Sequence, residues 1–140
     1  MDRTAQHIFR DHVHTVETHS GLTLPPLIKL YVIELLADYV DKPELVPPDE
    51  ALIILLDRAR TQHEKKTVGD LCLWITGVLP TYRSRRGMRR EYYQALGASA
   101  YSQTHSQVLV EISRNFTVVS DFVKLATHDC ESLYPIQFFD

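Results

Sequence analysis

Apolar residues recur every three or four positions along most of the chain, which is the pattern of amphipathic helices. The pattern stops near Ser20 and Gly21, where a glycine suits the end of a helix. The sequence therefore predicts a first amphipathic helix up to about residue 20. Its apolar stripe consists of Ala5, Ile8, Phe9, Val13 and Val16.

Residues 27–40, LIKLYVIELLADYV, are apolar on nearly every side of a helix. Pro25 and Pro26 precede them, and prolines fit only the first turn of a helix, where a missing N–H costs little. The length of the segment favours a helix over a strand. Since only a central position could bury so much apolar surface, we expect the core helix of the protein here.

Capping patterns indicate where the next two helices begin. Asp49 and Glu50 place negative charge at the start of one helix, whose apolar face would be Leu52, Leu55, Leu56 and Ala59. Thr67 and Asp70 have the T-x-x-D spacing of a capping box, and Pro80 ends the segment that follows. The sequence thus predicts a helix over 67–79, with a buried stripe of Leu71, Trp74, Ile75 and Val78.

Two further helices are expected after an arginine-rich connector, over residues 88–101 and 106–126. The second would bury Leu109, Ile112, Phe116, Val119 and Val123. The C-terminal tail, LYPIQFFD, is apolar and contains a helix-breaking proline, so it is expected to pack on the body or on a partner. With no repeat or linker, residues 1–140 are predicted to form one all-α domain, a bundle of about six helices with this tail.

Composition agrees with an ordinary globular chain of 140 residues, 44% hydrophobic and 24% charged. No apolar run reaches the length of a bilayer span, and the first residues lack the apolar core of a signal peptide. Cys72 and Cys130 lie far apart without metal-ligand spacing and are typical of reduced cysteines. We therefore expect a cytoplasmic protein that does not contact a membrane.

Five of the fifteen Lys and Arg residues fall within eight positions, although the formal net charge is −3. This cluster has two interpretations: a solvated connector that pairs with acidic groups, or an anion site for phosphate or nucleic acid. No recognition-helix pattern or row of aromatic residues accompanies it, which makes nucleic acid the less favoured partner. The cluster consists of Arg83, Arg85, Arg86, Arg89 and Arg90.

The stretch 88–101, MRREYYQALGASAY, places Tyr93, Gly97 and Tyr101 on one strip of a helix, with Tyr92 beside them. A glycine inside a helix costs about 1 kcal/mol against alanine, so another group must come close to Gly97. One interpretation is close packing of two helices. The other is a pocket between the 67–79 and 88–101 helices, in which Asp70, Arg86 or Arg90, and a tyrosine hydroxyl converge.

Evidence for metal or cofactor chemistry is weak. His7, Asp11, His14 and Thr18 share one helical face, but it points away from the apolar stripe and is better explained as a solvated face. No HExxH, P-loop, GxGxxG or GxSxG motif occurs. We therefore predict no catalytic residue, metal or cofactor.

A set of residues in the middle of the chain follows a distinctive order: Gly69-Asp70, Gly77, Pro80, Arg85-Arg86, Tyr92-Tyr93, Leu96-Gly97 and Ala100-Tyr101. This order resembles that of a family of small bacterial proteins of unknown function, over about residues 8–103. In that family a segment similar to LYVIELLADYV precedes a helix with Gly-Asp, an arginine-bearing loop and a YYxxLGxxAY stretch. Residues 72–75 depart from the expected sequence while remaining apolar. The resemblance implies a bacterial, cytoplasmic, helical protein and transfers no activity.

These observations favour a non-enzymatic helical module for protein interaction or regulation, with a homodimer as one possible form. Its contact surface would be the helix and loop around residues 82–101 or the apolar tail. The alternatives are a small-molecule-binding protein or enzyme with the pocket described above, and nucleic-acid contact through the arginine cluster.

Overall fold

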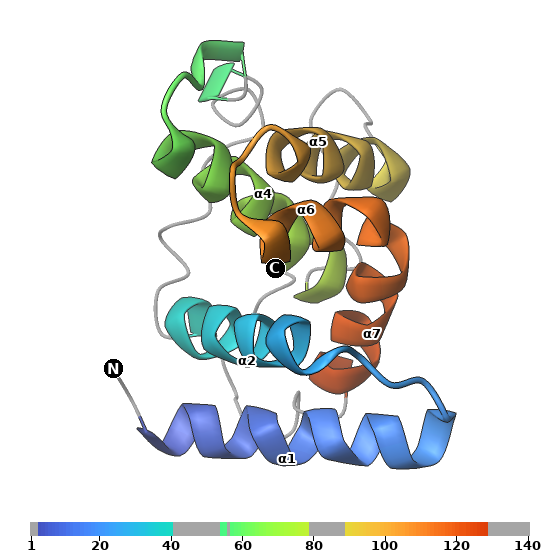
Figure 1. Ribbon diagram of the computed structural model, residues 1–140. Helices are drawn as coiled ribbons and strands as arrows, with labels where there is room; N and C mark the ends of the chain where they lie inside the picture. Colours follow the sequence, from blue (N-terminus) through green and yellow to red (C-terminus); the bar gives the residue numbers. More distant parts are fainter. Residues whose placement is uncertain (1–2, 41–53, 56, 79–88, 129–140) are drawn as a thin grey trace.

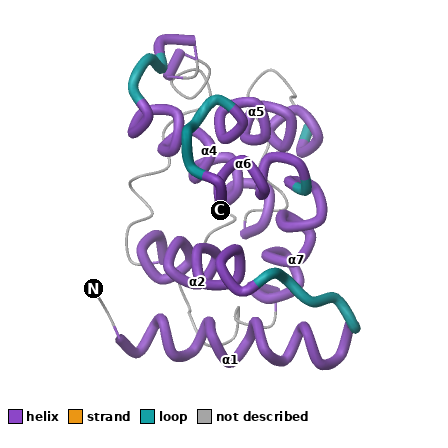
Figure 2. The backbone as a smooth tube through the Cα atoms, in the orientation of Figure 1, coloured by secondary structure: helices purple, strands orange, loops and turns teal. Residues whose placement is uncertain are grey.

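The computed structural model describes residues 3–40, 54–55, 57–78 and 89–128. In these residues the protein forms six helices and no strand, so the predicted all-α class is confirmed (Figures 1 and 2). The helices are α1 (Arg3–Ser20), α2 (Pro26–Val40), α4 (Gln62–Val78), α5 (Arg90–Ser102), α6 (Gln107–Arg114) and α7 (Phe116–His128).

Helix α4 is the centre of the bundle. Every residue from Val68 to Val78 is buried, because α5, α7 and α2 all pack against this helix. The expected stripe of Leu71, Trp74, Ile75 and Val78 is therefore buried together with everything between its members. Burial of a helix on all sides requires neighbours on all sides, and α4 supplies the surface on which α2, α5 and α7 assemble.

The expectation that residues 27–40 form the core helix needs correction. Helix α2 lies between α1 and α4 in Figure 1, although α1 also contacts α7, and the inner side of α2 is buried through Ile28, Val32 and Leu36. Its outer side is open, since Leu27 is 65% exposed and Leu30 is 47% exposed. Helix α2 is a layer on the core rather than its centre.

Helices α1 and α2 form an antiparallel pair, joined at Gly21, whose φ of 75° is readily adopted only by glycine. The predicted stripe of α1 is buried at Ala5, Phe9, Val13 and Val16. Glu17 ties the pair together, because its carboxylate accepts hydrogen bonds from the Leu24 N–H (3.1 Å) and from the Lys29 ammonium (2.8 Å).

The predicted capping box at Thr67 and Asp70 is wrong, because α4 begins earlier. The motif that starts the helix has the same form and lies at Thr61 and Glu64. The Thr61 hydroxyl accepts from the Glu64 N–H (3.1 Å), and the Glu64 carboxylate accepts from the Thr61 N–H (3.0 Å). Thr67 lies inside the helix and donates to the His63 carbonyl.

The single helix predicted over 106–126 is also wrong. The chain breaks at Asn115 (φ −126°, ψ 28°) into α6 and α7. The Asn115 amide group donates to the Glu111 carbonyl (3.1 Å), a local bond by which asparagine competes with helix continuation. The break lets both halves of the predicted stripe reach the core, and all five of its residues are buried.

In the helix predicted after Asp49, Leu55 was assigned to the buried face, but it is 41% exposed, whereas Ala59 is buried. Leu52 and Leu56 lie outside the described residues, as does the apolar tail, residues 129–140.

Replacing Glu17 by glutamine tests the tie between α1 and α2. Burial acts to raise the pKa of the Glu17 carboxyl, but the bonds from Lys29 and the Leu24 N–H outweigh it and hold the pKa below the ordinary value of 4.5. A depressed carboxyl pKa stabilises the fold above pH 4.5, and this contribution is lost as the pH falls further. We expect Glu17→Gln to lower the free energy of unfolding by about 0.5 to 1 kcal/mol at pH 7, and by much less near pH 3.

Urea denaturation at both pH values measures the effect. Asp38→Asn, at an exposed position of α2, is the matched control and should have little effect at either pH. If Glu17→Gln lowers the free energy of unfolding by the same amount at pH 7 and pH 3, the charged Glu17 carboxylate does not stabilise the α1–α2 pair.

Candidate functional site

The buried carboxylate of Asp70 is the centre of the main polar cluster among the described residues. Asp70 is 5% exposed, and its Oδ1 atom accepts hydrogen bonds from the Tyr31 hydroxyl and from the Tyr101 hydroxyl (2.5 Å). Its Oδ2 atom accepts from the Lys66 ammonium at 2.9 Å. One carboxylate thus connects α2, α4 and α5.

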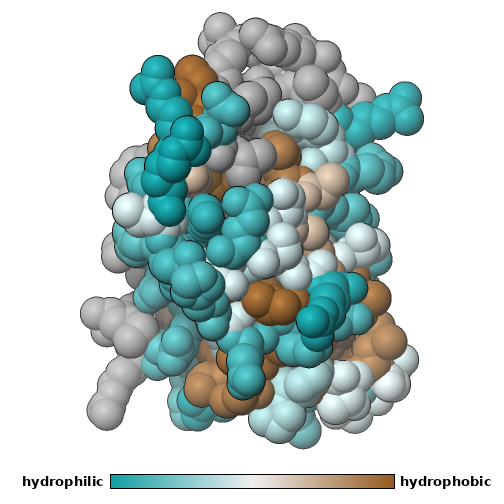
Figure 3. Space-filling view, turned by 45° about the horizontal axis from the view of Figure 1, so that its top comes forward, coloured by the Kyte–Doolittle hydropathy of each residue, from teal (hydrophilic) through white to brown (hydrophobic). Residues whose placement is uncertain are grey.

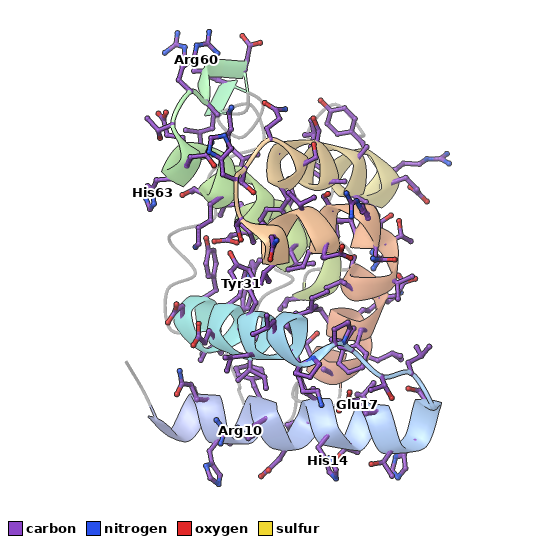
Figure 4. The ribbon with its side chains drawn as sticks, viewed as in Figure 1. Arg10, His14, Glu17, Tyr31, Arg60 and His63 are labelled. Carbon is purple, nitrogen blue, oxygen red and sulfur yellow. The ribbon has the colours of Figure 1, made fainter. Side chains whose placement is uncertain are left out.

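Local sequence explains how these groups meet. Lys66 and Asp70 are four residues apart on α4, so their side chains lie on one face of the helix. Gly69 makes room for α5, since a Cβ atom at this position would overlap the Tyr101 ring. Tyr31 reaches from α2 toward α4 (Figure 4).

The aromatic rings surround the carboxylate with apolar atoms. The rings of Tyr31 and Tyr101 meet edge to face, with centroids 6.3 Å apart, and the Lys66 ammonium lies 5.5 Å from the Tyr31 ring centroid. This geometry is typical of an aromatic pair and of a cation over an aromatic face. The cluster is therefore packed as well as hydrogen-bonded.

Both phenols remain protonated at any ordinary pH. Burial raises the pKa of Tyr31 and of Tyr101, and the negative charge of Asp70 raises both further. A protonated phenol is a hydrogen-bond donor, so the two hydroxyls together occupy both acceptor positions of Asp70 Oδ1. These two bonds leave Asp70 Oδ1 no free position to accept a hydrogen bond from a ligand.

Of the predicted site residues, the structure brings Asp70 and Tyr101 together. Sequence reasoning missed their other two partners, Tyr31 and Lys66. The spacing of Lys66 and Asp70 was a usable signal for one of them. Tyr31 could have been suspected because a hydroxyl in an apolar helix needs a buried acceptor.

Arg90 belongs to a different polar cluster, at the other end of α4. Its guanidinium donates to the Thr76 carbonyl (2.7 Å) and to the Ser120 hydroxyl (2.9 Å), and pairs with Asp121 (2.9 Å). The Ser120 hydroxyl in turn donates to the Thr76 hydroxyl. Arg90 therefore joins α4, α5 and α7 and does not converge with Asp70.

Gly97 allows neighbouring helices to pack closely. A Cβ atom there would overlap the Phe116 ring and lie 2.8 Å from the Cβ of Cys72. Tyr93 is fully buried, with its ring centroid 5.5 Å from that of half-buried Tyr92. The tyrosine strip thus faces the core of the bundle.

The remaining candidates are more exposed or lie elsewhere. Arg89 is exposed, whereas Arg83, Arg85 and Arg86 fall outside the described residues. The face formed by His7, Asp11, His14 and Thr18 is exposed, and the described part of the chain contains no group of three or more His, Cys, Asp or Glu residues that could hold a metal ion. Burial raises the pKa of the free Cys72 thiol to about 12, which makes it unreactive.

Within the described residues, none of the helices has both the length and the apolar character that a bilayer span requires. The chain matches no protein-family model, no curated protein and no solved structure. The resemblance noted from the sequence therefore stays a prediction.

Replacing Tyr101 by phenylalanine tests the Asp70 cluster. The variant keeps the ring in place but removes one of the two hydroxyl donors to a buried carboxylate, and hydrogen bonds to charged groups contribute about 1.5 to 3 kcal/mol. We expect a loss of that size in the free energy of unfolding, measured by urea denaturation. Tyr92→Phe, on the same helix but away from Asp70, is the matched control and should lose far less. Equal losses in the two variants would count against the cluster as a stabilising element.

Proposed function

We propose that the protein is a non-enzymatic protein-interaction module whose contact surface is an apolar ridge at the start of α2. The α2 ridge consists of Pro25, Pro26, Leu27 and Leu30, all exposed. The observation that carries the proposal is the exposure of its two leucines, 65% for Leu27 and 47% for Leu30. Exposed apolar side chains that adjoin one another on one face, rather than scatter singly, mark interaction surfaces.

Grooves flank the ridge on both sides. One lies between α1 and α2, has a volume of about 450 Å³, and is lined by Arg10, His14, Glu17, Pro26, Lys29, Leu30 and Ile33. The other lies between α2 and α6, has a volume of about 400 Å³, and is lined by Pro25, Pro26, Leu27, Ile28, Gln107, Val108 and Glu111. A partner could therefore contact the leucines from above and place side chains on either side of them.

The space-filling view shows hydrophobic patches that interrupt an otherwise hydrophilic surface (Figure 3). Most exposed apolar side chains of a globular protein are scattered singly and need no explanation. The α2 ridge differs because its apolar residues adjoin one another and border concave surface.

The alternatives have less support. For a pocket between the helices now described as α4 and α5, the glycines at 69 and 97 admit neighbouring rings rather than leave space, and the polar atoms around Asp70 bond to one another. For nucleic-acid contact, the guanidinium of Arg90 is already engaged by α4 and α7. Both the ligand pocket and the nucleic-acid contact therefore have less support than an interaction surface on α2.

Site-specific photo-crosslinking in the native host tests the proposal. With p-benzoylphenylalanine in place of Leu27, irradiation should produce a discrete crosslinked adduct, which Leu30→Asp should abolish. The control places the same group at Leu125, a 46% exposed leucine on α7, and should give no such adduct. Absence of an adduct at position 27, or an equal one at position 125, would overturn the proposed surface.

A further inference from the structure

We propose that the α2 ridge docks against the α2 ridge of a second copy of this chain, with Arg10 of each copy pairing with Glu34 of the other. This inference rests on the proposed function and names the partner of the same surface. It follows from the charges that surround the ridge and from what a symmetric contact requires.

Most charged groups around the ridge are already paired within the protein. Lys29 forms an ion pair with Glu17 at 2.8 Å, and Glu111 forms one with Arg114 at 3.0 Å. These four charges largely neutralise one another and add little attraction for a partner.

Arg10 and Glu34 are the exceptions among the charged groups that line the flanking grooves or lie within one turn of Leu30. Arg10 lines the groove between α1 and α2, which also contains Leu30, and is exposed; among the described residues its guanidinium has no ion pair or hydrogen bond. Glu34 lies one turn beyond Leu30 and is exposed, and the described part of the chain offers its carboxylate no partner either. On a helix, Leu27, Leu30 and Glu34 fall within about 60° of one another.

The surface therefore combines an apolar pair with one available charge of each sign. A contact between two identical surfaces requires that the surface contain its own complement, and every pairwise contact then occurs twice. The leucines supply an apolar centre that can match itself. The two charges supply a pair of symmetric bridges at its edge, where interfaces are usually polar.

A partner whose charges are all of one sign fits this surface less well. An acidic segment would match Arg10 but face the like charge of Glu34, whereas a basic segment would match Glu34 and face Arg10. Like charges across an interface oppose binding and select against the wrong partner. A second copy satisfies both groups at once.

Sedimentation equilibrium of the purified full chain tests the inference, from low micromolar to several hundred micromolar protein at low salt. We expect a reversible monomer–dimer equilibrium that Leu27→Asp abolishes. Leu125→Asp, the same substitution on α7, should leave it unchanged. All substituted positions are exposed, and thermal melting followed by circular dichroism verifies that each variant folds.

Charge reversal provides the decisive readout. Arg10→Glu and Glu34→Arg each place two like-charge contacts in the dimer and should raise its dissociation constant by about tenfold or more. The variant that carries both substitutions exchanges the charges and should recover most of the wild-type affinity. Recovery in the double variant cannot result from a general loss of surface charge.

A chain that remains monomeric at every concentration would overturn the inference, as would a dimer that is insensitive to Leu27→Asp or a double variant that does not recover. A monomeric chain that still gives an adduct with a different protein through position 27 in cells would overturn self-association and leave the interaction surface standing. Absence of any adduct at position 27 would instead overturn the proposed function itself.

Discussion

The fold depends on the pairing of one buried charge. Transfer of an ionised carboxylate out of water is costly unless hydrogen bonds and an opposite charge replace the solvent. Asp70 lies near the start of the buried part of α4, and it receives two phenol hydroxyls and an ammonium in place of water. Since these donors come from three helices, the positions of α2 and α5 against α4 are fixed by the requirement to satisfy one side chain.

A second polar cluster also fixes the positions of helices against α4, at the other end of this helix. Thr76, Ser120 and Arg90 connect α4, α5 and α7, and the Arg90 side chain also reaches Asp121 at the surface. The apolar contacts around the two clusters are close, because Gly97 admits Phe116 beside Cys72 and Gly77 admits the Val123 side chain just past Thr76. Apolar contacts are not directional, whereas each hydrogen-bonded cluster fixes distances and angles. The two clusters together specify one arrangement of helices that could otherwise slide along one another.

The sequence predicts much of this arrangement, and the predictions that were wrong have physical causes. Of the six helical segments that the sequence predicts, most are identified by an amphipathic stripe, because such stripes depend on local spacing alone. It does not identify the break at Asn115, since both halves of the stripe keep their spacing through the break. The choice between two T-x-x-acid patterns, Thr61 with Glu64 and Thr67 with Asp70, depends on which acid the tertiary structure buries.

In the candidate site, too, local sequence patterns predict some contacts and tertiary structure alone decides the others. Asp70 and Tyr101 could be associated from the sequence because α4 and α5 were expected to be neighbours. Tyr31 is 39 residues from Asp70 along the chain, and only the packing of α2 brings it there. The role of Arg90 was likewise hidden, because its partners Thr76 and Ser120 are separated by 44 residues and belong to helices whose relative positions no local pattern gives.

The core does not explain the leucines of the α2 ridge. Ile28, Val32, Leu35 and Leu36 already fill the inner side of α2, all within 5% exposure, so the fold would tolerate polar residues at 27 and 30. Burying a leucine stabilises a protein by about 1.5 to 3 kcal/mol, and most of this contribution is not realised while Leu27 remains 65% exposed. That unused apolar surface, placed between an available guanidinium and an available carboxylate, is better explained by association than by folding. The same reasoning separates the two sides of α2: the inner residues pack into the bundle, and the outer residues are left for a second molecule.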